Sequence, residues 1–250
     1  MSLNQWVCAL VMMSVCTSGE GQVLLFEGFD SSDRITGAEQ FFSDGADDYL
    51  GLSNGLFGGG PQPGVKNYSG FEGSFLTGQD LDGEGLSLPV ELTWDAIDVT
   101  GFSQLRFRGR FAEFFDSPGD IDAADFIAVS YRVDGGPFQD LIRFSGVDFN
   151  SGSSNGLFGL DENFDGVGDG ARLNGNATTF ESLLSVDGDL LDLRLALSLS
   201  SGDEDFAVDD FELAAVPEPR QTSVMAAVAI LILILVRRVQ RRPLEGETCG

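Results

Sequence analysis

Residues 191–199 read Leu-Asp-Leu-Arg-Leu-Ala-Leu-Ser-Leu. The leucines recur at every second position, so in a β-strand they all lie on one face, whereas in a helix they would be spread around the axis. The residues between them are mostly polar and suit the opposite face. This stretch therefore predicts a strand with one face in a core and the other on a polar surface.

The same alternation continues elsewhere in the chain. In residues 105–111 the aromatic side chains fall on one face and three arginines on the other. Residues 127–133 alternate likewise, and Asp-Gly-Gly-Pro at 134–137 turns the chain into residues 138–144, which predicts a hairpin. Further strands are expected at 23–26, 71–76, 90–97 and 206–213. The pattern predicts an all-β chain of about eight to ten strands, folded as a single β-sandwich of the jelly-roll, concanavalin-like kind.

The amino-acid composition excludes several kinds of functional site. Forty Asp and Glu face 14 Lys and Arg, which gives a net charge of −26. Such a field repels nucleic acid and suits a solvated external surface or divalent cations. The chain has no histidine, so serine triads and histidine-ligated metals are excluded. Its cysteines, Cys8, Cys16 and Cys249, all lie near the ends, so the predicted sandwich has no thiol nucleophile and no disulfide.

The C-terminal end has the physical properties of a membrane span. Residues 221–236 carry no charge and would form a helix of about 24 Å, close to the roughly 30 Å hydrocarbon core. A cluster of four arginines follows: Arg237, Arg238, Arg241 and Arg242. By the positive-inside rule this cluster is a cytoplasmic stop, so residues 243–250 form a cytoplasmic tail and everything before Pro217 lies outside. The alternative is a buried helix of a globular core, which the flanking arginines disfavour.

Pro217, Glu218 and Pro219 stand just before this apolar run. The ordered combination of this tripeptide, an apolar helix and a basic end, residues 217–242, resembles the PEP-CTERM sorting signal of Gram-negative bacteria. The resemblance implies recognition by an exosortase-type membrane protease. It also implies an inner-membrane intermediate that is later transferred to the cell surface or the extracellular matrix.

An outward-facing domain needs an export signal at its other end. Residues 6–15 are apolar and residues 16–21 are small and polar, as in a cleavable signal peptide. We therefore expect a signal peptide at 1–21 and an extracytoplasmic β-sandwich at 22–216.

The last predicted strand suggests a second, weaker resemblance. Phe-Ala-Val-Asp-Asp-Phe-Glu-Leu at 206–213 is similar to the closing strand of MAM-type and carbohydrate-binding jelly rolls, and residues 25–30 would be the first strand beside it. In such carbohydrate-binding sandwiches a structural calcium ion joins the two ends, which implies Glu27 and Asp210 as ligands. The alternative is that one aspartate of the Asp-Asp pair is exposed and the other caps a loop.

A second calcium candidate is the loop at residues 161–170. Asp161, Asn163, Asp165 and Asp169 occupy positions 1, 3, 5 and 9 of an EF-hand-like loop, with glycine at position 6. Arg172 stands where a closing glutamate is required, so a full EF-hand is excluded. A partial calcium loop and a plain Gly-Asp turn both remain open.

Three functional classes follow from these patterns. The favoured one is an exported, exosortase-sorted surface or matrix protein with a non-catalytic sandwich. The alternative is a calcium-dependent carbohydrate-binding module whose partner is an extracellular polysaccharide. The least favoured is a glycoside hydrolase, which would use a pair of carboxylates. Trp94, flanked by Glu91, Asp95 and Asp98, is either a platform that stacks on sugar or a core aromatic.

Overall fold

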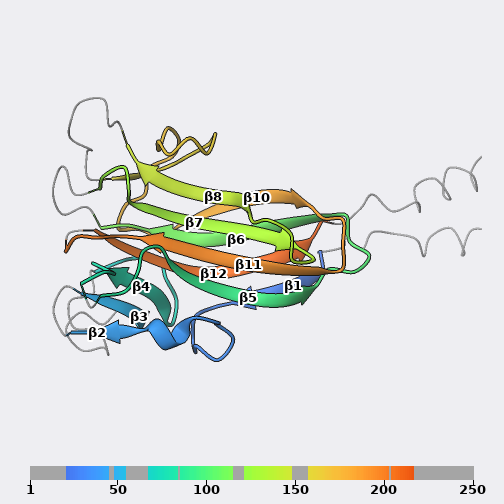
Figure 1. Cartoon of the computed structure of the whole chain (residues 1–250), viewed down its shortest axis with the longest axis horizontal. Coiled ribbons are helices and arrows are strands. Elements are labelled where there is room, and N and C mark those ends of the chain that lie inside the picture. The colour runs from blue at the N-terminus through green and yellow to red at the C-terminus, as the bar shows by residue number, and fades with distance from the viewer. Residues whose placement is uncertain are drawn as a thin grey trace, which may run out of the picture. The chain divides into compact units, whose positions relative to one another are not determined.

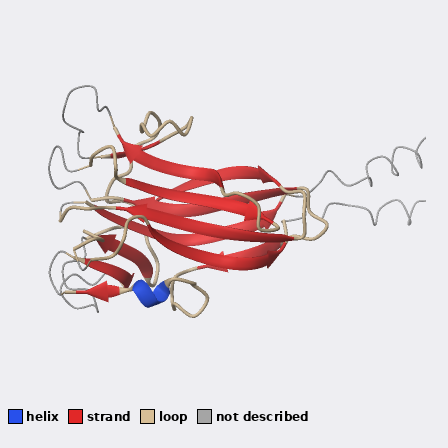
Figure 2. Ribbon diagram, viewed as in Figure 1, coloured by secondary structure: helices blue, strands red, loops and turns tan. Residues whose placement is uncertain are grey.

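The computed structural model describes residues 21–44, 48–54, 67–83, 85–114, 121–147, 157–202 and 204–216. Residues 22–216 form one compact unit, a sandwich of two β-sheets (Figures 1 and 2). Within the described residues no helix is long and apolar enough to cross a membrane. The predicted signal peptide, sorting motif and membrane helix lie outside the described residues, apart from Gly21.

The described part of the chain contains twelve strands and one short 3-10 turn at Ala38–Gln40. The strands are β1 Val23–Glu27, β2 Phe42–Ser43, β3 Tyr49–Ser53, β4 Phe75–Gln79, β5 Val90–Asp98, β6 Gln104–Ala112, β7 Phe126–Val133, β8 Gln139–Gly146, β9 Phe158–Leu160, β10 Thr178–Ser185, β11 Leu190–Ser198 and β12 Asp205–Ala215. The first sheet has the order β10-β6-β12-β4-β3-β2, and β1 also pairs with β12. The second sheet has the order β5-β11-β7-β8-β9. The expectation of an all-β sandwich is confirmed.

The core lies between the sheets and is built from the alternating stripes. The leucines of residues 191–199 are all fully buried, because they lie on the core face of a strand, β11, that pairs with β5 on one side and β7 on the other. From the first sheet Phe107, Phe111 and Phe211 meet them, and Phe211 packs against both other rings. Successive strands from β4 to β7 and from β9 to β12 alternate between the sheets, as in a jelly roll.

The sequence-based strand predictions hold where the alternation was clear. The hairpin of β7 and β8 turns at Asp134 and Gly135, which both have positive φ, as a primed turn requires. One prediction was wrong: residues 71–74 lie in a loop, and the strand begins at Phe75. Strands β2, β3, β9 and β10 were missed. Strand β3 is buried at four of its five positions, so it has no period-2 signal to detect.

Strand β12 pairs with three other strands of the first sheet. Its register with β6 shifts between Asp209 and Glu212, and Asp210 has φ of 52° at this bulge. The strand pairs with β4 through residues 205–208 and with β1 through residues 211–214. The predicted pairing of the first and last strands is therefore present, and the bulge lies where the partner of β12 changes.

Candidate functional site

The outer face of the first sheet carries a row of paired charges. The alternation of β6 turns its aromatic residues into the core, so Arg106, Arg108 and Arg110 project outward. Both Arg106 and Arg108 pair with Glu212, at 3.7 and 3.0 Å, and Arg110 pairs with Asp210 at 3.2 Å. Three arginines thus share two carboxylates of β12, so this row of paired side chains keeps one net positive charge in a very acidic chain.

An open groove of about 290 Å³ crosses this face. It runs over strands β10, β6, β12 and β1. Its lining residues are Phe26, Arg108, Gly109, Arg110, Thr179 and Asp210. The ring of Phe26 is 49% exposed although it is a large apolar side chain. An exposed aromatic ring beside planar hydrogen-bonding groups is the composition of a ligand site rather than of an ordinary sheet surface.

The position of Phe26 follows from the register of β1. Phe26 lies opposite Glu212 of β12, whereas Leu25 lies opposite the buried Leu213 and Glu27 opposite the buried Phe211. Because strand side chains alternate, Leu25 and Glu27 enter the core and Phe26 must face outward. Sequence reasoning missed Phe26 as a site residue, since its neighbours read as an ordinary buried strand.

A larger pocket of about 610 Å³ lies where the edges of β1 and β5 approach each other. Its lining includes Arg34 and two carboxylates, Asp95 and Asp98. Asp95 accepts a hydrogen bond from the Thr36 hydroxyl at 2.9 Å, and hydrogen bonds from Thr100 lower the pKa of Asp98. A glycosidase needs a carboxyl whose pKa is raised so that it can act as an acid. Asp98 has a lowered pKa instead, so it does not match the acid of a glycosidase.

Of the two alternatives that the sequence left open for Trp94, the structure shows the core aromatic and not the sugar platform. Only 2% of its surface is exposed, because it shares the inward face of β5 with Leu92. Its indole Nε1–H donates to Glu27 Oε2 at 3.1 Å, and its ring packs edge-on against Phe29. The tryptophan therefore joins the two sheets through a buried carboxylate.

The proposed calcium ligands at the two chain ends do not point to one place. Glu27 faces the core and accepts a second hydrogen bond from Phe29 N at 2.9 Å, while Asp210 faces the outer groove. The residue that stands out is the neighbouring Asp209. It is fully buried, its Oδ2 has no hydrogen-bond partner, and burial raises its pKa to about 7. The two adjacent aspartates drew attention to this position in the sequence, but the sequence did not show which of the two is buried.

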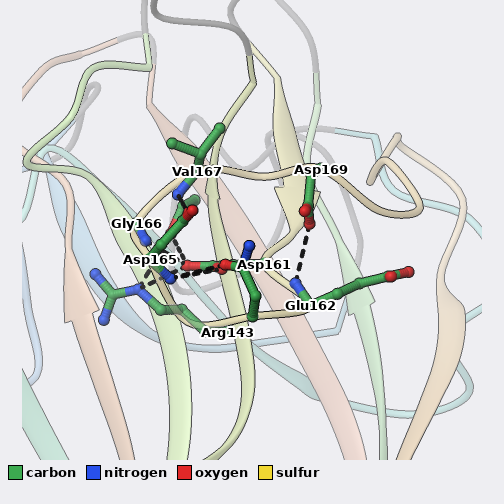
Figure 3. Close-up of polar contacts among 9 residues, drawn as sticks. Arg143, Asp161, Glu162, Asp165, Gly166, Val167 and Asp169 are labelled. Atoms are coloured by element: carbon green, nitrogen blue, oxygen red, sulfur yellow. Dashed lines mark hydrogen bonds and ion pairs between the residues drawn. The ribbon is translucent and has the colours of Figure 1, made fainter.

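The loop at 161–170 uses its side-chain oxygens to bind its own backbone (Figure 3). Asp161 is buried, and its carboxylate accepts from Asp165 N at 3.1 Å and from Gly166 N at 2.8 Å. It also lies 3.7 Å from Arg143 Nε. Asp161 therefore stabilises the turn from inside.

The other three predicted ligands do the same at the loop surface. Asn163 accepts from Asp165 N, Asp165 from Val167 N and Asp169 from Glu162 N, at 3.0, 3.0 and 3.1 Å. Among the described residues no group of three acidic, histidine or cysteine side chains is placed to hold a metal ion. Calcium in this loop remains a prediction from sequence, as does calcium at the two chain ends, where Glu27 faces the core and Asp210 faces the outer groove.

No family model and no curated protein matches this chain. Among solved structures, the chain is similar to the CBM22-1 xylan-binding domain of Paenibacillus barcinonensis Xyn10C, with a TM-score of 0.41 and 12% identity over 81% of this chain and 99% of that one. It is also similar to the K1 cleaved adhesin domain of Lys-gingipain from Porphyromonas gingivalis W83, with a TM-score of 0.40 and 14% identity over 77% and 98% of the two chains. At such values, what those proteins bind is no guide to the ligand of this chain.

Proposed function

We propose that this protein is an exported, non-catalytic β-sandwich that binds a neutral extracellular polysaccharide in the groove across β10, β6, β12 and β1. The observation that carries the proposal is the half-exposed ring of Phe26 beside arginines that are already paired with carboxylates. The apolar face of a sugar ring can pack on the phenyl ring. Its hydroxyl groups can then bond to the guanidinium and carboxylate edges of Arg108, Arg110 and Asp210.

The charge of the molecule favours a neutral ligand over an acidic one. With a net charge of −26 the protein repels polyanions at long range. Within the groove, Arg108 and Arg110 are already paired with Glu212 and Asp210, although Glu212 is shared with Arg106. An open groove on a sheet also accommodates a chain that extends beyond it at both ends. A polysaccharide meets both conditions.

Replacing Phe26 with alanine should weaken binding of the purified full-length protein to an immobilised neutral glycan about tenfold or more, with little change in Tm. The reason is that Phe26 contributes contact area to the ligand and little to the core. Binding is measured on a glycan array and then by titration with the best glycan.

Leu190→Ala is the matched control for Phe26→Ala. Leu190 is similarly exposed, at 47%, but it belongs to the second sheet. It should bind as the wild type does. Absence of any glycan binding by the wild type, or full binding by the Phe26 variant, would overturn the assignment of this groove.

The route to the surface is the second part of the proposal, and it rests on the sequence of the tail. Replacing Pro217, Glu218 and Pro219 together with alanine should leave export intact and cause an uncleaved membrane form to accumulate. The intact mass of the surface or matrix form is the measurement. Alanines at Gln221, Thr222 and Ser223 serve as the control and should not alter processing. The same mature mass in the tripeptide variant and the wild type would contradict recognition by an exosortase-type protease.

Calcium between the first and last strands is the third part. Asp209 is the residue that suits such an ion, because its buried Oδ2 accepts no hydrogen bond. The nearby Asp30 also repels its negative charge. A calcium ion bound there would be held by Asp209 and Asp30 and would add to the positive charge that Arg110 already supplies nearby.

A further inference from the structure

The groove reaches the edge of the first sheet at β1, and a second hollow begins there. Among the described strands β1 pairs with β12 alone, so its other edge is open. The pocket of about 610 Å³ lies along that edge. Val23 and Leu24 of β1 line the pocket, while Phe26 of the same strand lines the groove. The two hollows therefore adjoin at one strand.

Arg34 connects the pocket with the groove. Its side chain lines the pocket, and its Nη1 donates to the backbone oxygen of Phe26 at 3.2 Å. A ligand that lies on the Phe26 ring and continues past β1 therefore comes next to the Arg34 guanidinium. A guanidinium has five N–H donors, so the bond to Phe26 uses part of its capacity and leaves donors for a ligand.

The opposite wall of the pocket is formed by a bulge in β5. Asp95 and Ala96 together stand opposite the single residue Asp192 of β11, and both are exposed. In a regular strand Asp95 and Asp98 would face opposite sides, because they are three residues apart. The extra residue of the bulge places them on the same side, and both line the pocket.

The bulge holds a strained backbone in place. Ala96 has φ of 56°, in the left-handed region that residues other than glycine seldom adopt. Its N–H donates to Asp192 Oδ1 at 2.8 Å, and Asp192 Oδ2 accepts from Arg132 Nε at 2.7 Å. Because Ala96 is exposed, core packing does not offset the strain. Strain that is held in this way is typical of binding sites.

The polar groups of the pocket suit sugar hydroxyl groups, which both donate and accept hydrogen bonds. Arg34 supplies donors, and the carboxylates of Asp95 and Asp98 supply acceptors. Asp95 is held by the hydroxyl of Thr36 at 2.9 Å. Hydrogen bonds from the hydroxyl and the N–H of Thr100 lower the pKa of Asp98, so its carboxylate is an acceptor at neutral pH.

On the basis of the function proposed for the groove, we propose that this pocket is a second part of the same glycan site. The ligand is then a polysaccharide that runs through the groove, crosses the edge of β1 and enters the pocket. The four strands under the groove span about 14 Å, at about 4.8 Å between neighbours. A short oligosaccharide fills the groove alone, whereas a longer chain also contacts Arg34, Asp95 and Asp98.

The test compares short and long glycans in the variant Arg34→Ala. Soluble cello-, xylo- and manno-oligosaccharides, from disaccharide to hexasaccharide, are titrated into the full-length protein by calorimetry. We expect the affinity of the wild type to rise from the shortest glycan that binds to the hexasaccharide. Arg34→Ala should lower the affinity for the hexasaccharide about tenfold and that for the shortest glycan less than about twofold.

Ala96→Gln tests the pocket without removing a charge. The longer side chain occupies the pocket, so it should weaken hexasaccharide binding and leave the shortest glycan unaffected. Ala96→Gly is its matched control, because glycine keeps the pocket open and adopts this φ without strain. Arg172→Ala is the control for Arg34→Ala. Arg172 is also exposed, does not line either hollow, and its loss changes the net charge by the same amount.

The pocket assignment is overturned if Arg34→Ala binds the hexasaccharide as the wild type does, or loses the same factor for short and long glycans. Binding that still depends on Phe26 would then leave the groove assignment standing. If the wild type binds none of the three series, the pocket assignment falls as well, and the glycan array decides the groove separately.

Discussion

Replacing Trp94 with alanine lowers the free energy of unfolding by about 3–5 kcal/mol, the largest effect we expect from a single substitution. The change removes a large aromatic side chain from the centre of the sandwich, where it contacts Phe29 and Phe211. It also removes the donor to Glu27 Oε2, so that a buried carboxylate loses one of its two partners. Urea unfolding followed by circular dichroism measures the loss.

Two companion variants separate packing from hydrogen bonding. Trp94→Phe keeps much of the apolar volume but loses the indole N–H, so it should cost less than the alanine variant. Combining Trp94→Phe with Glu27→Gln removes the buried negative charge and should recover part of that cost, as a double-mutant cycle would show. Phe26→Ala, on the exposed face of β1, is the control for removal of an aromatic ring. If Trp94→Ala stayed within about 1 kcal/mol of the wild type, the buried position of Trp94 would be wrong.

Asp161→Ala is expected to have the second largest effect, a loss of about 2–4 kcal/mol in the free energy of unfolding. The substitution leaves the N–H groups of Asp165 and Gly166 without their acceptor and removes the carboxylate that lies 3.7 Å from Arg143 Nε. Removal of one partner of a buried charged network costs more than the net value of the contact, because the other groups stay desolvated. Chemical denaturation at pH 7 gives the difference.

The exposed neighbour Asp165 supplies the comparison for Asp161. Asp165→Asn keeps an oxygen that can accept from Val167 N, so its effect should stay below about 0.5 kcal/mol. Equal losses in the Asp161 and Asp165 variants would contradict the structural role of Asp161. The same substitution tests the calcium prediction for this loop. If the loop binds calcium, EGTA should destabilise the wild type more than it destabilises Asp161→Ala, and the comparison is made in the Asp209→Asn background so that the site proposed at Asp209 does not contribute.

The alternation of apolar and polar residues correctly predicted the features that depend on a single strand. The leucines of residues 191–199 lie in the core, and the arginines of residues 105–111 face outward, because alternation in a strand needs no knowledge of the partner strand. Strand β3 was missed for the complementary reason. The loop that carries Tyr68 packs against Tyr49, so Tyr49 is buried on the face that would otherwise be polar.

The role of a side chain depended on which strands became neighbours. Trp94 and Glu27 are far apart in the chain, and only the packing of one sheet on the other made them a buried hydrogen-bonded pair. The residues that line the groove come from β10, β6, β12 and β1, and none of these segments predicts the groove by itself. The Asp-Asp pair at 209–210 was visible in the sequence, yet the bulge of β12 decided that Asp209 is buried and Asp210 faces outward.

The sequence by itself determined the all-β class, the faces of the strongly alternating strands, the acidic character and the exclusion of histidine and thiol chemistry. It is also the only basis for the predicted export and sorting signals, which are read from linear order. The tertiary structure alone decided where Phe26, Trp94 and Asp209 lie and what they contact. The physical reason is that alternation is a property of one strand, whereas a groove or a buried hydrogen-bonded pair arises only when strands distant in sequence meet.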